Sequence, residues 1–330
     1  MNYLISQVIA HGPAVKEFQL RREDGAALPG WQPGAHIVLH FAAPDGGALE
    51  RHYSLIGAAR ADDTDANIYR IAVQREDGGK GGSRCLHDAF GVGSTIGLSG
   101  PFNSFPLHMN ADADSGAGAV ARASRVLLVA GGIGITPLVS MAHALSTAGQ
   151  PFELHYLVRS AERLVLLDEL RAIPGAVIVP HVSDDTGRAD LNALLGPYRD
   201  GDSLYACGPA ALLQGLAAAG AQSGWPAGAL HFESFGARTQ LEDGPLTVEL
   251  SLSGISVEVQ PGTSILDALL AADAFVSYDC KRGECGNCYT PVLEGQPLHR
   301  DVCLTPAMRE AGMCTCVSWA GAPGRLVLEL

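Results

Sequence analysis

The stretch Cys280-Lys-Arg-Gly-Glu-Cys285-Gly-Asn-Cys288 decides the fold of this 330-residue chain, and Cys316 follows 28 positions after Cys288. Three thiols in one short loop, with a fourth far along the chain, form the C-x4-C-x2-C…C spacing of plant-type 2Fe-2S ligands. Zinc sites instead favour paired C-x2-C knuckles. The sequence therefore predicts a 2Fe-2S cluster bound by Cys280, Cys285, Cys288 and Cys316.

The identity of the fourth ligand depends on the cysteines downstream of the loop. Cys316 fits the long spacing best, Cys314 is the second candidate, and we interpret Cys303 as a buried or idle thiol. Within the loop, Gly283 and Gly286 let the backbone turn its N-H groups toward the sulfurs. Those N-H groups would stabilise the negative charge of the cluster.

Composition and charge exclude several classes of protein. The chain has 35 acidic and 22 basic residues, a formal net charge of -13, so nucleic acid and anionic membranes are unfavourable partners. The N-terminus lacks the cationic start and apolar core of a secretion signal. The uncharged stretch between Arg125 and Glu153 is cut by glycines and a proline into strand, turn and helix. We expect a cytoplasmic protein without membrane contact, where disulfides are unfavourable.

Residues 1–109 predict a small β-barrel, because short alternating segments are separated by Gly, Pro and Asp turns. Within this range, Arg51-His52-Tyr53-Ser54 supplies a cation, a flat aromatic ring and a hydroxyl, and Gly81-Gly82-Ser83-Arg84 opens a short helix. A helix N-terminus attracts phosphate, and the Arg51 guanidinium can donate charge-assisted hydrogen bonds to the same phosphate. These residues are suited to holding the phosphate and ring of a flavin. The alternative is that Arg51 is an ordinary surface residue and Tyr53 an ordinary core residue, without a ligand.

Residues 125–235 alternate strand and helix, which predicts a parallel α/β sheet. One strand, Val126 to Ala130, runs into a glycine-rich turn and a helix that starts near Pro137. The glycines of this turn, Gly131, Gly132 and Gly134, let a pyrophosphate approach the backbone closely. Thr136 can add a hydrogen bond from its hydroxyl. Since the order is not G-x-G-x-x-G, it indicates only a phosphate-bearing ligand.

A later strand of the same region, Ser203 to Ala206, ends in Cys207-Gly208-Pro209. Ligands bind at the carboxyl ends of strands in α/β sheets, so the thiol and glycine are candidates for contact with a reactive ring. The alternative is that Cys207 is a small buried apolar residue.

The rest of the chain completes three predicted domains. Residues 110–124 and 236–245 are small and polar, which is typical of linkers. Residues 246–330 predict a β-grasp fold, because two strands around Ser253-Gly254 and a helix from Thr263 to Ala271 precede the cysteine loop.

These motifs, in this order and over essentially the whole chain, resemble the phthalate dioxygenase reductase family. This family comprises reductase components of two-component Rieske oxygenases, and the chain is similar also to vanillate O-demethylase reductase. The resemblance implies an FMN-binding β-barrel (1–109), an NAD(H)-binding α/β domain (125–235) and a plant-type ferredoxin (246–330). It implies an NADH-dependent oxidoreductase that passes electrons through FMN and 2Fe-2S to a separate Rieske-type oxygenase, an aromatic dioxygenase or O-demethylase.

The resemblance also assigns residues to the cofactors. Ser54 would lie near the flavin nitrogen that accepts hydride, and Phe235 would pack against the ring. We expect Ser54, Cys207 and Phe235 to position or polarise the rings, without a general base or nucleophile. Glu233, His52 and His181 are interpreted as hydrogen-bonding or surface residues rather than acid-base groups. The expected cofactor-binding residues are Arg51, His52, Tyr53, Ser54, Gly81, Gly82, Ser83, Arg84, Gly131, Gly132, Gly134, Thr136, Pro137, Arg159, Cys207, Gly208, Pro209 and Phe235.

Several alternatives stay open. Arg159 and Arg163 follow the second strand of the sheet beside Glu162, so NADH is favoured only modestly over NADPH. FMN rather than FAD depends on the resemblance, and the extra thiol in Met313-Cys314-Thr315-Cys316 departs from the commonest family form. The partner is alternatively a cytochrome P450 or a carnitine-type oxygenase, or the chain is a redox sensor with little turnover. We expect a monomer.

Overall fold

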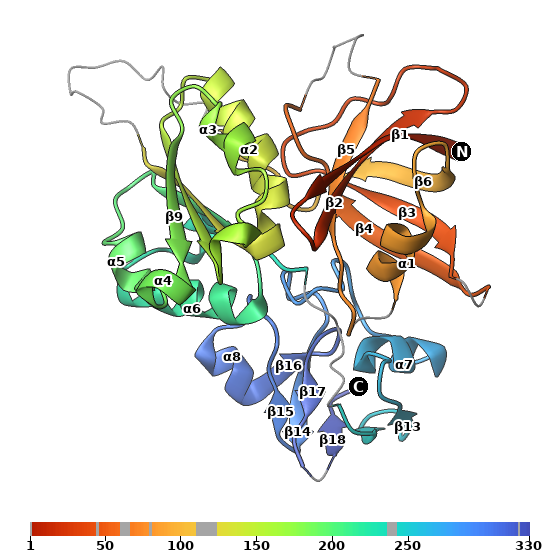
Figure 1. Cartoon of the computed structure of the whole chain (residues 1–330). Helices are drawn as coiled ribbons and strands as arrows, with labels where there is room; N and C mark the ends of the chain where they lie inside the picture. Colours follow the sequence, from red (N-terminus) through yellow and green to blue (C-terminus); the bar gives the residue numbers. More distant parts are fainter. Residues whose placement is uncertain are drawn as a thin grey trace. The chain divides into compact units, whose positions relative to one another are not determined.

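The computed structural model describes residues 2–43, 46–59, 67–78, 81–109, 124–235, 243–322 and 324–330 (Figure 1). Most of both predicted linkers, 110–124 and 236–245, lies outside the described residues. The chain forms two compact units, the first of residues 1–208 and 218–231 and the second of residues 209–217 and 232–330.

The first part of unit 1 is the predicted β-barrel. Its neighbouring strands are antiparallel, in the order β4-β3-β6-β1-β2-β5. An isolated antiparallel bridge from Leu55, just after β4, to Ile71 in β5 links the two edges, and full closure removes exposed strand edges. The elements are β1 (Asn2–His11), β2 (Val15–Arg22), β3 (His36–Ala42), β4 (Ala48–Ser54), β5 (Tyr69–Gln74), α1 (Gly82–Ala89) and β6 (Thr95–Phe102).

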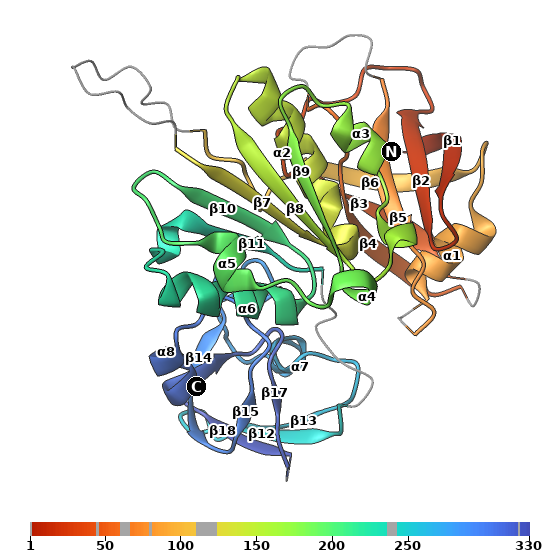
Figure 2. The same ribbon diagram turned by 60° about the vertical axis from the view of Figure 1, so that its left-hand side comes forward.

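The second part is the predicted parallel sheet, in the order β11-β10-β7-β8-β9 (Figure 2). Continuous apolar strands such as β7, buried at every position, are typical of sheets covered on both faces. The strands are β7 (Val126–Gly131), β8 (Phe152–Val158), β9 (Val177–Val182), β10 (Ser203–Cys207) and β11 (Leu230–Glu233). The helices are η1 (Gly132–Gly134), α2 (Ile135–Thr147), η2 (Ala161–Arg163), α3 (Leu167–Arg171), α4 (Ser183–Thr186), α5 (Leu191–Leu195), α6 (Ala210–Gln222), whose residues up to Ala217 belong to unit 2, and η3 (Ala227–Ala229).

One helix expected from the sequence near Leu164 to Ala172 is shorter than the apolar run suggests. Only Leu167–Arg171 is α-helical, because Leu166 adopts a left-handed φ of 59° that a continuous helix cannot contain. Val165 and Leu166 are buried in the sheet's core, 7% and 5% exposed. Burial of these side chains therefore outweighs helix propensity at this point.

The barrel and the parallel sheet share apolar core, which explains why they form one unit. The cluster that contains α2 and the sheet interior also contains Val15, Ile56, Ala72 and Phe105 from the barrel region. In addition, the backbone N-H of Gly34 donates to Ser140 Oγ in α2 at 3.0 Å.

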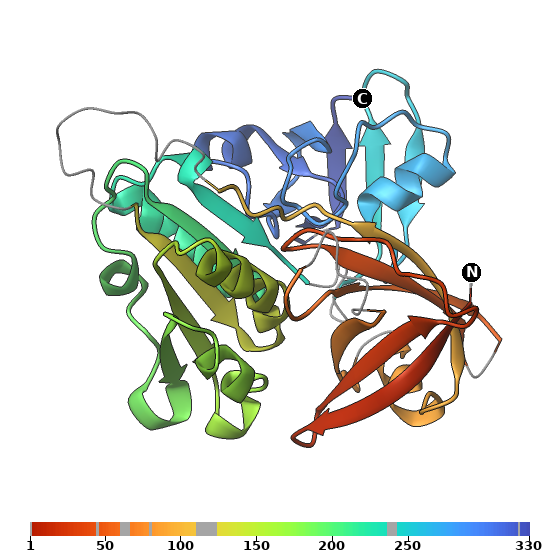
Figure 3. The same ribbon diagram turned by 90° about the horizontal axis from the view of Figure 1, so that it is seen from above.

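Unit 2 contains the predicted β-grasp fold (Figure 3). A mixed sheet, β13-β12-β18-β14-β16, has parallel pairing only between β12 and β18 among the pairs described, and α7 buries Ile265, Leu266 and Leu269 in its core. The elements are β12 (Leu246–Leu250), β13 (Ser256–Val259), α7 (Ile265–Ala271), β14 (Tyr289–Glu294), β15 (Pro297–Leu298), α8 (Pro306–Ala311), β16 (Gly312–Cys314), β17 (Trp319–Ala320) and β18 (Arg325–Leu328). Of the helices in the described ranges, none has the length and apolar character to cross a bilayer.

Arg70 on β5 is an ionic link between the barrel and α3. Its guanidinium donates to both carboxylate oxygens of Glu17 at 2.7 and 3.1 Å and to both of Glu169 at 3.1 and 2.8 Å. Burial of Glu17 opposes its ionisation, but hydrogen bonds from His11 and Arg70 outweigh this and lower its pKa to about 2. Glu169 also has its pKa lowered to about 2, where bonds from His143 and Arg70 outweigh burial.

We expect Arg70→Met to lower the free energy of unfolding by about 3 kcal/mol at pH 7, because it leaves two partly buried carboxylates uncompensated. Both carboxylates have folded pKa values below the usual 4.5, so the ion pairs contribute above that pH and lose their effect as pH falls toward 2. The difference between wild type and variant in urea unfolding should therefore be largest above about pH 4.5 and shrink as pH falls from there toward 2.

A matched control is Arg325→Met, which removes exposed pairs with Glu249 and Glu294. Exposed pairs contribute about 0–1 kcal/mol. Equal losses for the two variants, or a loss at Arg70 that grows with acidity, would contradict the account.

Candidate functional site

The barrel brings the two predicted flavin motifs together. A Cβ added to Gly82, the first residue of α1, would lie 2.3 Å from Arg51 Nε, so the guanidinium lies directly against the start of the helix. Gly81, with a φ of 78°, precedes α1 and provides no side-chain cap, so the first-turn N-H groups lack a side-chain acceptor from this position. A cation beside uncapped helix N-H groups fits a phosphate.

The remaining residues of these motifs differ in accessibility. Arg84 is exposed, whereas Ser83 Oγ accepts a bond from the backbone N-H of Glu76 at 3.0 Å. His52 is exposed, and its ring stacks on His36 at 5.3 Å. Contact of these residues with a flavin phosphate stays a prediction.

Ser54, at the end of β4, has a buried hydroxyl that a ligand could satisfy. It is 4% exposed, and its Oγ has no hydrogen-bond partner among the described residues. A buried hydroxyl without a partner costs about 1–3 kcal/mol. Next to it, burial raises the pKa of Tyr53, so this phenol stays neutral. A flavin ring offers Ser54 polar atoms and Tyr53 a flat surface, so these residues fit FMN.

The glycine-rich turn after β7 has two distinct parts. Gly132 has a φ of 57°, and no atom lies within 4 Å of the place where a Cβ would be. Space beside its backbone is therefore open to a ligand. Gly134 serves packing instead, because a Cβ there would lie 2.2 Å from the carbonyl oxygen of Cys207. The Thr136 hydroxyl donates to the carbonyl of Ile133 at 3.0 Å, and Pro137 is buried in α2. A phosphate would therefore meet Gly132 first, since Gly131 is buried at the end of β7.

Cys207 ends β10 directly beside this turn. It is 0% exposed and belongs to the apolar core of the sheet, and Gly208 is buried beside it. The contact with Gly134 brings the two predicted nucleotide motifs, far apart in sequence, to one place. The position at the carboxyl ends of β7 and β10 is where parallel sheets bind ligands. Contact of the thiol with a nicotinamide ring stays a prediction, as does a role for Pro209, which is exposed.

Arg159 follows β8 at the same end of the sheet. Its side chain is 79% exposed, and its Nε lies 3.6 Å from the carboxylate of Asp184 in α4. The backbone N-H of Asp184 also donates to the Arg159 carbonyl at 2.9 Å. Sequence reasoning missed Asp184, because only the pairing of β8 with β9 brings α4 next to Arg159.

The cysteine loop of unit 2 has the backbone that a cluster requires. Lys281, Gly283 and Gly286 all have left-handed φ values, of 53°, 73° and 77°. The backbone N-H of Arg282 donates to Cys280 Sγ at 3.3 Å, and that of Asn287 to Cys285 Sγ at 3.5 Å. Donors aimed at the sulfurs fit ligands that carry negative charge.

The geometry favours Cys316 over Cys314 as the fourth ligand. Cys316 accepts a bond from the Gly283 backbone and interacts with Cys288 and Cys280, so it faces the loop. Cys314 also interacts with Cys288, but its sulfur lies 3.8 Å from that of Cys303. In the described residues, no three His, Cys, Asp or Glu side chains converge on one ion position. The two irons of a 2Fe-2S cluster each bind two of the four thiolates, so its ligands need not converge on a single ion position.

A buried charge cluster behind the loop was not predicted. Arg282 lies 3.7 Å from Glu233 and 3.2 Å from Glu284, and the backbone N-H of Ser234 donates to Glu284. Burial raises the pKa of Glu233 to about 8, while Arg282 opposes the shift. Glu233 is 1% exposed, so it is a buried residue and not a surface one. Phe235, two positions later, is 43% exposed, and its contact with a flavin stays a prediction.

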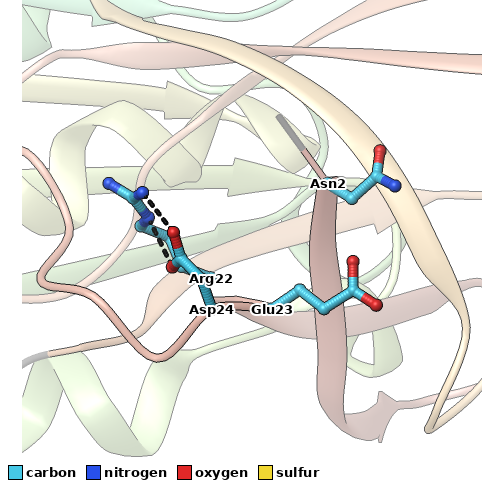
Figure 4. Close-up of a pocket in the computed structure, with 4 residues that line it drawn as sticks. All are labelled: Asn2, Arg22, Glu23 and Asp24. Atoms are coloured by element: carbon cyan, nitrogen blue, oxygen red, sulfur yellow. Dashed lines mark hydrogen bonds and ion pairs between the residues drawn. The ribbon is translucent and has the colours of Figure 1, made fainter.

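A surface pocket elsewhere on the barrel contains no predicted site residue. Asn2, Arg22, Glu23 and Asp24 line it, and the Arg22 guanidinium pairs with the Asp24 carboxylate (Figure 4). Two of its charges, those of Arg22 and Asp24, are therefore paired with each other.

Comparisons with known proteins match both the cluster domain and the whole chain. Residues 248–320 match the 2Fe-2S iron-sulfur cluster binding domain family. The heme-dependent oxidative N-demethylase beta subunit of Ectopseudomonas mendocina is 37% identical over 96% of this chain and 95% of its own length. Phthalate dioxygenase reductase of Burkholderia cepacia is 36% identical over 95% of this chain and 92% of its own length.

A solved structure of phthalate dioxygenase reductase, described as modular for electron transfer from pyridine nucleotides to [2Fe-2S], has a TM-score of 0.68. It is 34% identical and covers 100% of this chain and 98% of its own. The predicted family and the fold class, with flavin-type barrel, nucleotide sheet and ferredoxin, are confirmed.

For the cluster, we expect Cys316→Ser to reduce iron and acid-labile sulfide content by most of their wild-type amount. The same change at Cys314 should leave both nearly intact, because Cys314 faces Cys303. Iron and sulfide assays with visible absorbance check this. A larger loss from Cys314→Ser than from Cys316→Ser would reverse the assignment.

Proposed function

The chain belongs to the family of oxygenase reductases that includes phthalate dioxygenase reductase, and we propose that it passes electrons from NADH through FMN and a 2Fe-2S cluster to a separate oxygenase. The observation that carries this function is that one chain holds the ferredoxin domain together with the complete barrel and nucleotide sheet of its relatives. When bound, FMN accepts a hydride and the cluster accepts single electrons, so the pair converts two-electron donors into one-electron outputs.

The protein's own residues supply position and electrostatics for this chemistry. Arg51 and the start of α1 hold the phosphate, and the Ser54 hydroxyl gains a hydrogen-bond partner at the ring. Gly132 offers the nucleotide phosphates open backbone, while Gly134 holds the turn against Cys207. In unit 2, N-H groups of the cysteine loop favour the negatively charged cluster. No general base is required by this scheme.

The partner we propose is a Rieske-type oxygenase, as in the reductase systems for phthalate. A second candidate is a haem-containing partner, because one relative is the beta subunit of a heme-dependent oxidative N-demethylase. Coupled turnover with each oxygenase type distinguishes the two.

A redox sensor is the rival function of a different class, and NADH-dependent reduction of cytochrome c tests it. Turnover by holoprotein supports the reductase, and its absence from cluster-loaded, flavin-loaded protein would favour the sensor.

We expect Ser54→Ala to retain FMN but to slow NADH-dependent flavin bleaching by about tenfold, the equivalent of one lost hydrogen bond. Stopped-flow absorbance checks this. Ser6→Ala is a matched control in the same barrel, since Ser6 Oγ bonds only to the Gln19 carbonyl among the contacts described. Similar rates for Ser54→Ala and wild type would remove Ser54 from the site.

Asp184 should determine nucleotide preference, because its carboxylate beside Arg159 would repel a 2'-phosphate. We expect Asp184→Asn to lower the KM for NADPH by about tenfold with little change for NADH. Asp185→Asn, which alters the adjacent carboxylate of α4, is the control. An equal effect of both variants, or no gain with NADPH, would contradict this role.

A further inference from the structure

We propose that Phe275 is the anchor by which the cluster domain binds its terminal oxygenase, on a surface formed by Phe275, Tyr278 and the exposed side of the cysteine loop. Phe275 is 88% exposed, the highest value among the large apolar residues in the described ranges. Its neighbours Ala274 and Val276 are 8% and 5% exposed and belong to the domain core. The backbone is therefore fixed while the ring projects into solvent.

The turn that presents Phe275 is a well-defined helix cap. The N-H of Ala274 bonds to the carbonyl of Leu269 at 3.0 Å, and that of Asp273 to Leu270 at 3.2 Å. Asp273 has a left-handed φ of 56°. This combination is the Schellman motif that ends α7, and it fixes the direction in which the chain leaves the helix. Because such a cap holds the segment, the exposure of Phe275 is a feature of the fold rather than of a loose loop.

A second aromatic residue extends the surface toward the cluster loop. Tyr278 is 47% exposed, and Lys281 Nζ lies 4.5 Å from its ring centre. Lys281 also pairs with Asp267 in the first turn of α7 at 3.0 Å. These contacts tie Tyr278 to both the helix and the loop. Cys285, an expected cluster ligand, is itself exposed.

The charge of this surface indicates the chemistry of its partner. Asp273 and Asp279 are both exposed on either side of Phe275 and Tyr278, and a cluster with four thiolates adds negative charge. Aromatic residues in the middle of a surface with charged residues around it are typical of protein interfaces. The complementary partner has an apolar pocket with Lys or Arg at its rim. Reduction adds one negative charge, so the reduced domain should bind a basic partner more tightly than the oxidised domain.

The terminal oxygenase is the occupant because electrons must leave the chain where the cluster is accessible. This inference rests on the proposed function. It assigns the site of recognition to particular side chains outside the cofactor sites, and truncating a central aromatic anchor typically weakens association by about tenfold or more.

The test uses full-length holoprotein, with a purified terminal oxygenase that turns over with the wild-type reductase as the probe. We expect Phe275→Ala to raise the KM for the oxygenase by about tenfold, while NADH-driven reduction of the variant's own cluster keeps its wild-type rate. Phe275→Leu, which keeps an apolar anchor, should restore most of the affinity. Leu252→Ala is the matched control, since Leu252 is 76% exposed in the β12–β13 connection and lies outside the proposed surface.

A charge variant tests whether the acidic residues of this surface contribute to binding of a basic partner. Asp273→Asn preserves the cap, because Asn tolerates the left-handed conformation, and removes the charge. It should raise the KM for the oxygenase several-fold at low salt and weaken its dependence on ionic strength.

The outcomes separate the alternatives. An unchanged KM in Phe275→Ala overturns the proposal. Slower reduction of the variant's own cluster would assign the surface to internal electron transfer, and a wild-type dimer that Phe275→Ala dissociates would assign it to a second copy; either also overturns it. If wild-type protein fails to reduce its cluster with NADH, the proposed function itself is wrong, which is a distinct result.

Discussion

The structure depends on one backbone constraint: the cysteine loop must turn its N-H groups toward its own thiolates. Lys281, Gly283 and Gly286 adopt left-handed φ values in a stretch of six residues. Glycine does so at no steric cost, and a Cβ at Gly283 would lie 2.6 Å from Val317. Lys281 lacks that freedom, and its contacts with Asp267 and Tyr278 offset part of the cost. The loop can therefore stabilise a negatively charged cluster because these positions and their surroundings permit an unusual path.

The same constraint accounts for what surrounds the loop. Glu284 and Arg282, between the cluster ligands, form a buried ionic cluster with Glu233 and the Ser234 backbone. Glu233 is the last residue of β11, and Ser234 and Phe235 follow it in the chain. The residues between the ligands thus tie the loop to residues 233 and 234 of the same unit. The barrel and the nucleotide sheet, by contrast, are joined within unit 1 by shared core and by Arg70.

Much of this organisation could be predicted from local sequence patterns. The cysteine spacing, the strand-turn-helix after β7 and the alternating barrel strands each depend on neighbours close in sequence, and the fold class followed from them. What could not be predicted depends on distant pairs. Nothing in the sequence places Asp184 beside Arg159 or Glu233 beside Arg282. The sequence pattern makes Gly134 a ligand contact, yet its missing Cβ makes room for Cys207, 73 positions away.

The most direct measurement of the central claim is an anaerobic titration of purified holoprotein with NADH, followed by visible absorbance and electron paramagnetic resonance. If FMN and a 2Fe-2S cluster act in series in one chain, the protein will take up about three electron equivalents, two in the flavin and one in the cluster, and will develop the signal of a reduced cluster. Uptake of about two equivalents without that signal, in protein that contains iron and sulfide, would contradict it.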